Sequence, residues 1–196
     1  QAIKNKIDVA ILDDGFQDIS INKNLIIICF NEKQWIGNGL TIPAGPLRES
    51  LSALKRANCV VINGNKNEEI ENQINKENND IKIFYTKYIP INFNNFLNKK
   101  IIAFAGIGNP TNFFDLLKEN KINTLENLSF PDHHPYSNEE LDNLLKKAEE
   151  NNAILLTTKK DYYRIDKNYQ KNINYLEILL NLKNKDKFIE EIKKII

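Results

Sequence analysis

The sequence predicts an α/β fold in which a mostly parallel sheet is covered by helices on both faces. Short apolar runs of strand length alternate with stretches of helical periodicity along all 196 residues. A capped amphipathic stretch over residues 138–150 is bordered on both sides by such runs. The predicted strands, in order, are residues 8–12, 25–30, 59–63, 81–88, 101–105, 124–128, 153–157 and 176–180.

Helix signals fill the intervals between these runs. Ser137 and Glu140 form a capping box, and apolar residues then recur on one face, which predicts a helix over 138–150. Asn109 followed by Pro110 predicts a second helix start. Further helices are predicted over residues 49–56, 68–77 and 186–196.

The chain divides into two predicted domains and a terminal helix. Residues 90–98 interrupt the pattern with Pro, Asn and other polar residues. We therefore expect one α/β domain over 1–91, a smaller one over 92–180, and a C-terminal helix over 181–196 that packs back on the first.

Composition excludes several classes of protein. With 27 basic against 26 acidic residues, the net charge of +1 gives no field that would attract nucleic acid. No apolar run approaches the roughly 20 residues that span a bilayer, and two isolated cysteines do not support a disulfide framework. The chain begins with Gln and contains no Met, so we expect it to be a piece of a longer protein.

The first candidate site is the acidic pair Asp13 and Asp14, which follows an apolar run and precedes Gly15. A carboxylate at a strand end can hold Mg²⁺ beside nucleotide phosphates. An ordinary turn explains Asp-Asp-Gly equally well, and no glycine-rich phosphate loop of the G-x-x-x-x-G-K-[ST] form occurs in the sequence.

The second candidate is the Pro- and Gly-rich loop over residues 37–49, which ends in Arg48 and Glu49. Such a loop can present backbone N–H groups and these two side chains at a helix N-terminus, where an anion is favoured. The alternative is a purely structural loop.

Three further segments follow predicted strands. Gly106 and Gly108 suggest a dinucleotide turn, but Thr111 occupies the third glycine position, which favours a tight βα turn. Asp132 and His133, in a run that also contains the second histidine, could form an acid–base pair or a metal site, or an exposed turn. The segment Thr157-Thr158-Lys159-Lys160-Asp161 could hold a phosphate or form a solvated helix cap.

In their order and spacing these motifs resemble the tetraacyldisaccharide 4'-kinase (lipid A 4'-kinase) family, over its C-terminal two-thirds. The motifs are Asp13-Asp14-Gly15-Phe16-Gln17, Gly37-Asn38-Gly39, Pro43-Ala44-Gly45-Pro46-Leu47-Arg48-Glu49, Ala105-Gly106-Ile107-Gly108-Asn109-Pro110, Phe130-Pro131-Asp132-His133 and Thr157-Thr158 with Lys160-Asp161. The resemblance implies a P-loop-kinase-like sheet whose phosphate loop, catalytic aspartate and membrane-associating helix lie upstream of this chain.

The resemblance also implies a function and residue roles. The activity is transfer of the ATP γ-phosphoryl group to the 4'-hydroxyl of a tetraacyldisaccharide 1-phosphate, at the cytoplasmic face of the bacterial inner membrane. Asp13 and Asp14 would serve Mg²⁺, and Arg48 and Glu49 would contact the nucleotide. His133 would be catalytic, with Asp132 orienting it. By itself the chain is expected to be inactive, with membrane association coming from the upstream segment.

Two departures from the family pattern concern neighbouring loops, where this chain has Asp18-Ile19-Ser20 after the acidic motif and Lys159 before the Lys-Asp pair. Two other functions stay open from the residues alone. One is a metal-dependent phosphoesterase that uses Asp132, His133 and His134 as ligands, with Asp13 and Asp14 supplying further ones. The other is a non-catalytic α/β binding module.

Overall fold

The computed structural model describes residues 8–195, which form two compact units. Within the described range, the first unit contains residues 8–87 and 182–195, and the second contains residues 88–181. The chain passes from one unit to the other within β3 (Lys82–Pro90) and returns within β8 (Ile178–Leu182), which are neighbours in one sheet. The predicted domain limits at residues 91 and 180 fall in or beside these two strands.

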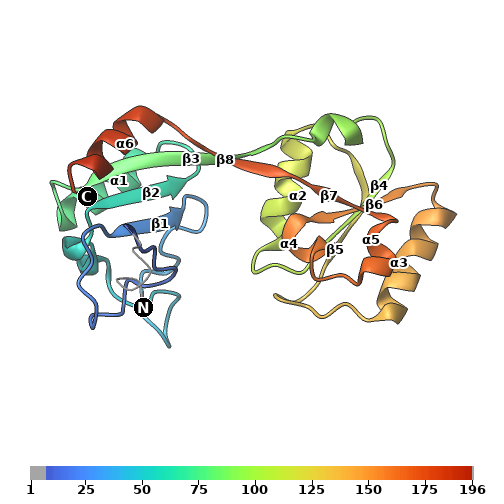
Figure 1. Cartoon of the computed structure of the whole chain (residues 1–196), viewed down its shortest axis with the longest axis horizontal. Coiled ribbons are helices and arrows are strands. Elements are labelled where there is room, and N and C mark those ends of the chain that lie inside the picture. The colour runs from blue at the N-terminus through green and yellow to red at the C-terminus, as the bar shows by residue number, and fades with distance from the viewer. Residues whose placement is uncertain (1–7, 196) are drawn as a thin grey trace. The chain divides into compact units, whose positions relative to one another are not determined.

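The first unit is built on a sheet of order β1-β2-β3-β8, in which β1 (Ile27–Asn31), β2 (Cys59–Asn63) and β3 are parallel. The 3-10 helix η1 (Leu51–Arg56), α1 (Glu68–Glu77) and α6 (Lys185–Lys193) complete it, as Figure 1 shows. The apolar core consists of Leu54, Ala57, Val60, Ile62, Ile70, Ile74 and Ile81. The central strand β2 is apolar at nearly every position because both of its faces are covered.

Helix α6 packs within this unit. The ring of Phe188 meets Phe84 of β3 edge to face, with 4.9 Å between the ring centroids. The sequence predicts this helix over 186–196, and the structure gives it as Lys185–Lys193.

The second unit is an all-parallel sheet of order β5-β4-β6-β7. Its strands are β4 (Ile101–Ala105), β5 (Thr124–Ser129), β6 (Ile154–Thr158) and β7 (Ile173–Leu176). Its helices are η2 (Phe93–Phe96), α2 (Pro110–Glu119), α3 (Asn138–Glu150), α4 (Lys159–Tyr162) and α5 (Lys167–Gln170).

Strand β4 is buried along its whole length and separates two apolar clusters. Ile101, Ala103 and Ala105 face α2, whereas Ile102 and Phe104 face α3. Helices α2 and α3 accordingly lie on opposite faces of the sheet in Figure 1. The fold class expected from the sequence, parallel sheets with helices in the α/β class, is confirmed.

Local capping rules account for the helix starts. Ser137 and Glu140 form both hydrogen bonds of the predicted capping box at α3. Asn67 caps α1 by accepting from the backbone N–H groups of Glu69 and Ile70. At α2 the limit set by Pro110 is confirmed, but the side chain of Asn109 makes no cap bond.

The predicted strand over residues 8–12 is wrong. No strand forms there, and the side chain of Ile11 is 91% exposed. An apolar run becomes a strand only when a neighbouring strand satisfies its backbone N–H and C=O groups, and among the described residues no strand pairs with this run.

Two smaller predictions also need correction. The expected helix over 49–56 is the 3-10 helix η1, whose i→i+3 pattern begins with Ala53 N–H donating to Ser50 C=O. The predicted strand over 176–180 covers parts of two strands, because β7 ends at Leu176 and β8 begins at Ile178. No helix among residues 8–195 has the length and apolar character needed to cross a membrane.

Candidate functional site

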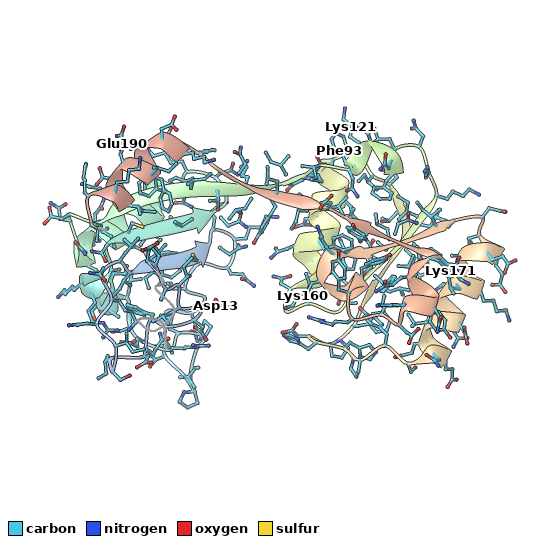
Figure 2. The ribbon with its side chains drawn as sticks, viewed as in Figure 1. Asp13, Phe93, Lys121, Lys160, Lys171 and Glu190 are labelled. Carbon is cyan, nitrogen blue, oxygen red and sulfur yellow. The ribbon has the colours of Figure 1, made fainter. Side chains whose placement is uncertain are left out.

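In the first unit, Asp13 and Asp14 lie on an exposed turn and not at a strand end. Asp14 has a positive φ of 53°, a conformation that Asp tolerates in turns. Its carboxylate receives Arg48 Nη1 at 2.7 and 2.8 Å, and the same nitrogen lies 3.4 Å from Gln17 Oε1. The structure thus brings the acidic motif to the end of the Pro- and Gly-rich loop. Figure 2 labels Asp13 on this part of the first unit.

A second contact joins the same two segments. Both carboxylate oxygens of Glu49 accept from Arg56 Nη2, at 2.8 and 2.9 Å. The guanidinium of Arg56 also stands 4.6 Å from the centre of the Phe16 ring. No sequence motif identifies Arg56 as a site residue. Its position seven residues after Glu49 is the one signal that places it close to this loop.

The oxygen donors of this group suit Mg²⁺, which proteins hold through one or two carboxylates together with substrate phosphates and water. Asp14 and Glu49 are each paired with an arginine in this structure. Within residues 8–195, no group of three or more His, Cys, Asp or Glu side chains is arranged to hold a metal ion.

The Pro- and Gly-rich loop is closed by its own hydrogen bonds. The N–H groups of Ala44 and Gly45 donate to Thr41 C=O, and Leu47 N–H donates to Leu40 C=O. These N–H groups are thus used internally, and the helix that follows is the six-residue η1. These bonds favour the structural interpretation of the loop backbone, which leaves the side chains of Arg48 and Glu49 as its candidate site groups.

In the second unit, the candidate residues gather at the carboxyl ends of adjacent strands. The glycine turn with Gly106 follows β4, Asp132 and His133 follow β5, and Asp161 follows β6. Helix α2, after β4, packs on one face, whereas Ile165 and Tyr162, after β6, pack on the other. Parallel α/β sheets bind ligands at such a switch between neighbouring strands.

The side chain of Asp161 is fully buried and holds this switch point together. Its Oδ2 accepts from Gly106 N–H at 3.1 Å and from the Thr158 hydroxyl at 2.6 Å. Arg164 Nη1 lies 3.2 Å from its Oδ1.

Thr158 is also the N-cap of α4, and Thr157 is buried with its hydroxyl donating to Phe104 C=O. The predicted helix cap is therefore present, but it is not solvated, because Thr157 and Asp161 are buried and Lys160 (Figure 2) is the exposed residue of this segment.

The glycine turn after β4 is a tight packing turn. A Cβ added at Gly106 would lie 2.9 Å from the Tyr136 hydroxyl and 3.1 Å from Pro131 C=O. Its N–H is already bonded to Asp161. These contacts favour the structural reading of the segment over a dinucleotide site.

His133 is exposed, with its backbone in the left-handed region at φ 58°. Its backbone N–H donates to Gly106 C=O at 3.1 Å, and its ring Nδ1 lies 3.2 Å from Arg164 Nη2. Asp132 Oδ2 is 3.8 Å from the ring Nε2, which exceeds hydrogen-bond distance. The nearest polar group to the ring is therefore Arg164, and no motif in the sequence had identified it.

His134 is a packing residue. Its Nε2 is 2.9 Å from Glu140 Oε1, and its ring contacts Phe130 in a tilted arrangement and Tyr136 edge to face, at centroid distances of 4.9 and 5.0 Å. The phosphoesterase alternative required both histidines as metal ligands, and in this structure Nε2 of His134 is committed to Glu140.

The hydroxyl of Tyr136 is buried beside the glycine turn without a hydrogen-bond partner among the described residues. Burial, and then the negative charge of Asp161, raises the pKa of Tyr136, so the phenol stays neutral. Its ring contacts Phe104, Phe130 and His134, so it is part of one aromatic cluster with them.

Comparison with known proteins gives consistent matches. The model of the LpxK family, described as tetraacyldisaccharide-1-P 4'-kinase, matches residues 1–196. A tetraacyldisaccharide 4'-kinase of Pelagibacter ubique is 39% identical over 198 residues, covering 100% of this chain and 63% of that protein. The Rickettsia akari protein of the same name is 36% identical, covering 96% of this chain and 57% of its own length.

A solved structure is also similar. The "apo" form of LpxK from Aquifex aeolicus, in complex with ATP, superposes with a TM-score of 0.64 at 26% sequence identity. The match covers 92% of this chain and 55% of the solved chain. This chain therefore spans about three-fifths of the length of the proteins to which it is similar.

Proposed function

The chain belongs to the tetraacyldisaccharide-1-P 4'-kinase family, and we propose that the protein containing it transfers the γ-phosphoryl group of ATP to the 4'-hydroxyl of a tetraacyldisaccharide 1-phosphate. The observation that carries this proposal is the match of the family model to every residue of the chain. The similarity to a solved structure that contains ATP supports ATP as the donor.

In this proposal the first unit serves the metal and the nucleotide. Asp13, Asp14 and Glu49 would supply oxygen ligands to Mg²⁺, directly or through water, and Arg48 would contact a phosphate. Mg²⁺ would neutralise charge on the transferring phosphoryl group. The contacts of Asp14 with Arg48 and of Glu49 with Arg56 hold these acids in place before a nucleotide arrives.

The second unit would contribute His133 to the reaction. Phosphoryl transfer depends mainly on positioning and on neutralising charge, so a fixed imidazole at an exposed edge suits this role. Asp132 lies 3.8 Å from the ring and would add negative charge beside it. We also propose that the protein acts at the cytoplasmic face of the bacterial inner membrane, where its lipid substrate would be found.

The test uses the longer protein that contains this chain. Purified protein with ATP, Mg²⁺ and the tetraacyldisaccharide 1-phosphate should give the 4'-phosphorylated product, detected by mass spectrometry. Omitting the lipid controls for ATP hydrolysis. The 196-residue chain alone should give no product, since it contains no glycine-rich phosphate loop. ATP consumption that is independent of the lipid would contradict the proposed acceptor.

A further inference from the structure

The guanidinium of Arg164 connects the buried centre of the second unit to the exposed ring of His133. Its Nη1 donates to Gly106 C=O at 3.0 Å and to Asp161 Oδ1 at 3.2 Å. Its Nη2 is directed to His133 Nδ1 at 3.2 Å. The Arg164 side chain is 23% exposed and its partner Asp161 is fully buried, so the position of the guanidinium is fixed by a buried ion pair.

The chemistry of this contact determines which nitrogen of His133 carries a proton. An arginine is a donor only and stays charged throughout the accessible pH range. Nδ1 must therefore accept the hydrogen bond with its lone pair, and the proton of the neutral ring lies on Nε2. A proton on Nδ1 would place two N–H donors against each other.

The backbone reinforces this orientation. His133 N–H donates to Gly106 C=O, the same oxygen that accepts from Arg164. The positive φ of His133 costs roughly 1 kcal/mol for a residue other than glycine. In this conformation Nδ1 lies toward Arg164, at 3.2 Å from its Nη2. Nε2, on the far side of the ring, is 3.8 Å from Asp132 Oδ2 and makes no hydrogen bond to it.

We propose that Arg164 is a positioning residue that fixes His133 as the Nε2–H tautomer. On the proposed kinase function, on which this step rests, His133 then donates a hydrogen bond from Nε2 to an anionic oxygen in the reaction. It does not take the proton of the attacking hydroxyl, because a neutral ring with a protonated Nε2 has no lone pair there.

The first test is independent of catalysis. The ¹⁵N chemical shifts of the imidazole nitrogens are measured in the 196-residue chain at about pH 8.5, where an ordinary imidazole is neutral. His133→Asn assigns the signals, since the chain has two histidines. We expect His133 Nδ1 at the shift of an unprotonated acceptor and Nε2 at that of an N–H. A protonated Nδ1 in the unchanged protein would overturn the proposal, whatever the variants do.

The variants then test the cause. Arg164→Met keeps the unbranched apolar stem of the side chain without the guanidinium donors, and should move His133 toward the tautomer mixture of a free imidazole. Arg164→Lys keeps the charge but has no planar fork to bind three acceptors, so it should restore the tautomer only in part. As a control, Lys167→Met removes an exposed cation three residues further along the chain and should change neither histidine. An unchanged His133 spectrum in folded Arg164→Met, checked by circular dichroism, would overturn the proposal.

The catalytic consequence is measured in the longer protein. Arg164→Met should lower kcat about 100-fold, as small displacements of a reacting group do, with the KM values for ATP and lipid nearly unchanged. An undiminished kcat would remove the positioning role. If the longer protein has no kinase activity while the tautomer is as expected, the proposed function fails and the tautomer assignment stands.

Discussion

The carboxylate of Asp161 accepts a hydrogen bond from the backbone N–H of Gly106 at 3.1 Å, across a separation of 55 residues in the sequence. This bond ties the ends of two neighbouring parallel strands, β4 and β6. Because Arg164 binds both partners, the contact also sets where His133 stands. A buried acid that looks like a helix-cap residue in the sequence therefore organises the candidate site of the second unit.

Asp161→Ala should destabilise the protein by about 3–5 kcal/mol, the usual cost of leaving the partner of a buried ion pair uncompensated. Gly106 N–H would also lose its acceptor. Chemical denaturation of the variant measures the change. As a control, Asp142→Asn alters an exposed acid that bonds to Tyr169 and should stay within about 0.5 kcal/mol of the original. If both substitutions lowered the free energy of unfolding equally, the proposed structural role of Asp161 would be contradicted.

The two histidines should separate into one functional and one structural residue. In the longer protein, His133→Ala should lower kcat by about 100-fold or more and leave the unfolding transition nearly unchanged, because its ring is 67% exposed. His134→Ala should mainly destabilise the fold, by about 1–2 kcal/mol, since it removes the bond to Glu140 and the aromatic contacts. If instead His134→Ala lowered kcat and His133→Ala lowered the stability of the fold, the functional role would belong to His134.

The two glycines of the turn after β4 should differ in their tolerance of a methyl group. Gly106→Ala should cost about 1–3 kcal/mol, because the added Cβ would meet the Tyr136 hydroxyl at 2.9 Å and Pro131 C=O at 3.1 Å. Gly108→Ala should be nearly neutral, since its nearest neighbour would be Asp132 Oδ2 at 3.5 Å. Thermal unfolding compares the two, and a larger loss at Gly108 would contradict the packing described for this turn.

The acids of the first unit should control the response to magnesium. In the longer protein, Asp13→Asn, Asp14→Asn and Glu49→Gln should each raise the Mg²⁺ concentration needed for half-maximal activity, by about tenfold or more, because each removes a charged oxygen ligand. Activity is titrated with Mg²⁺ at saturating ATP. Asp18→Asn is the matched control, since this carboxylate bonds within its own loop to Ser20. An equal shift for Asp18 would indicate a general effect of loop charge.

Several parts of the structure follow from local sequence rules. The capping box of Ser137 and Glu140 depends on residues three positions apart, and Pro110 limits α2 through its own ring. Strand β4 is apolar throughout because helices cover both of its faces. The motifs at Asp13, Glu49 and His133 could likewise be recognised in order, and that order identified the family.

Residues 8–12 show that local hydrophobicity does not by itself predict a strand. Their apolar side chains predict a buried strand, but strand formation depends on a pairing partner elsewhere in the chain, and none of the described strands pairs with them. The ion pair of Asp14 with Arg48 and the contact of Arg56 with the Phe16 ring likewise arise from the folding of separate segments onto one another.

The sequence by itself determined the α/β class, most helices and strands, the family, and the candidate site residues at Asp13, Glu49 and His133. Only the tertiary structure decided that His133 is exposed while His134 is packed, and that Arg164 rather than Asp132 is hydrogen-bonded to the His133 ring. The reason is physical. Periodicity and capping act between residues a few positions apart, whereas the contacts of Asp161 and Arg164 join strand ends that only the parallel sheet brings together.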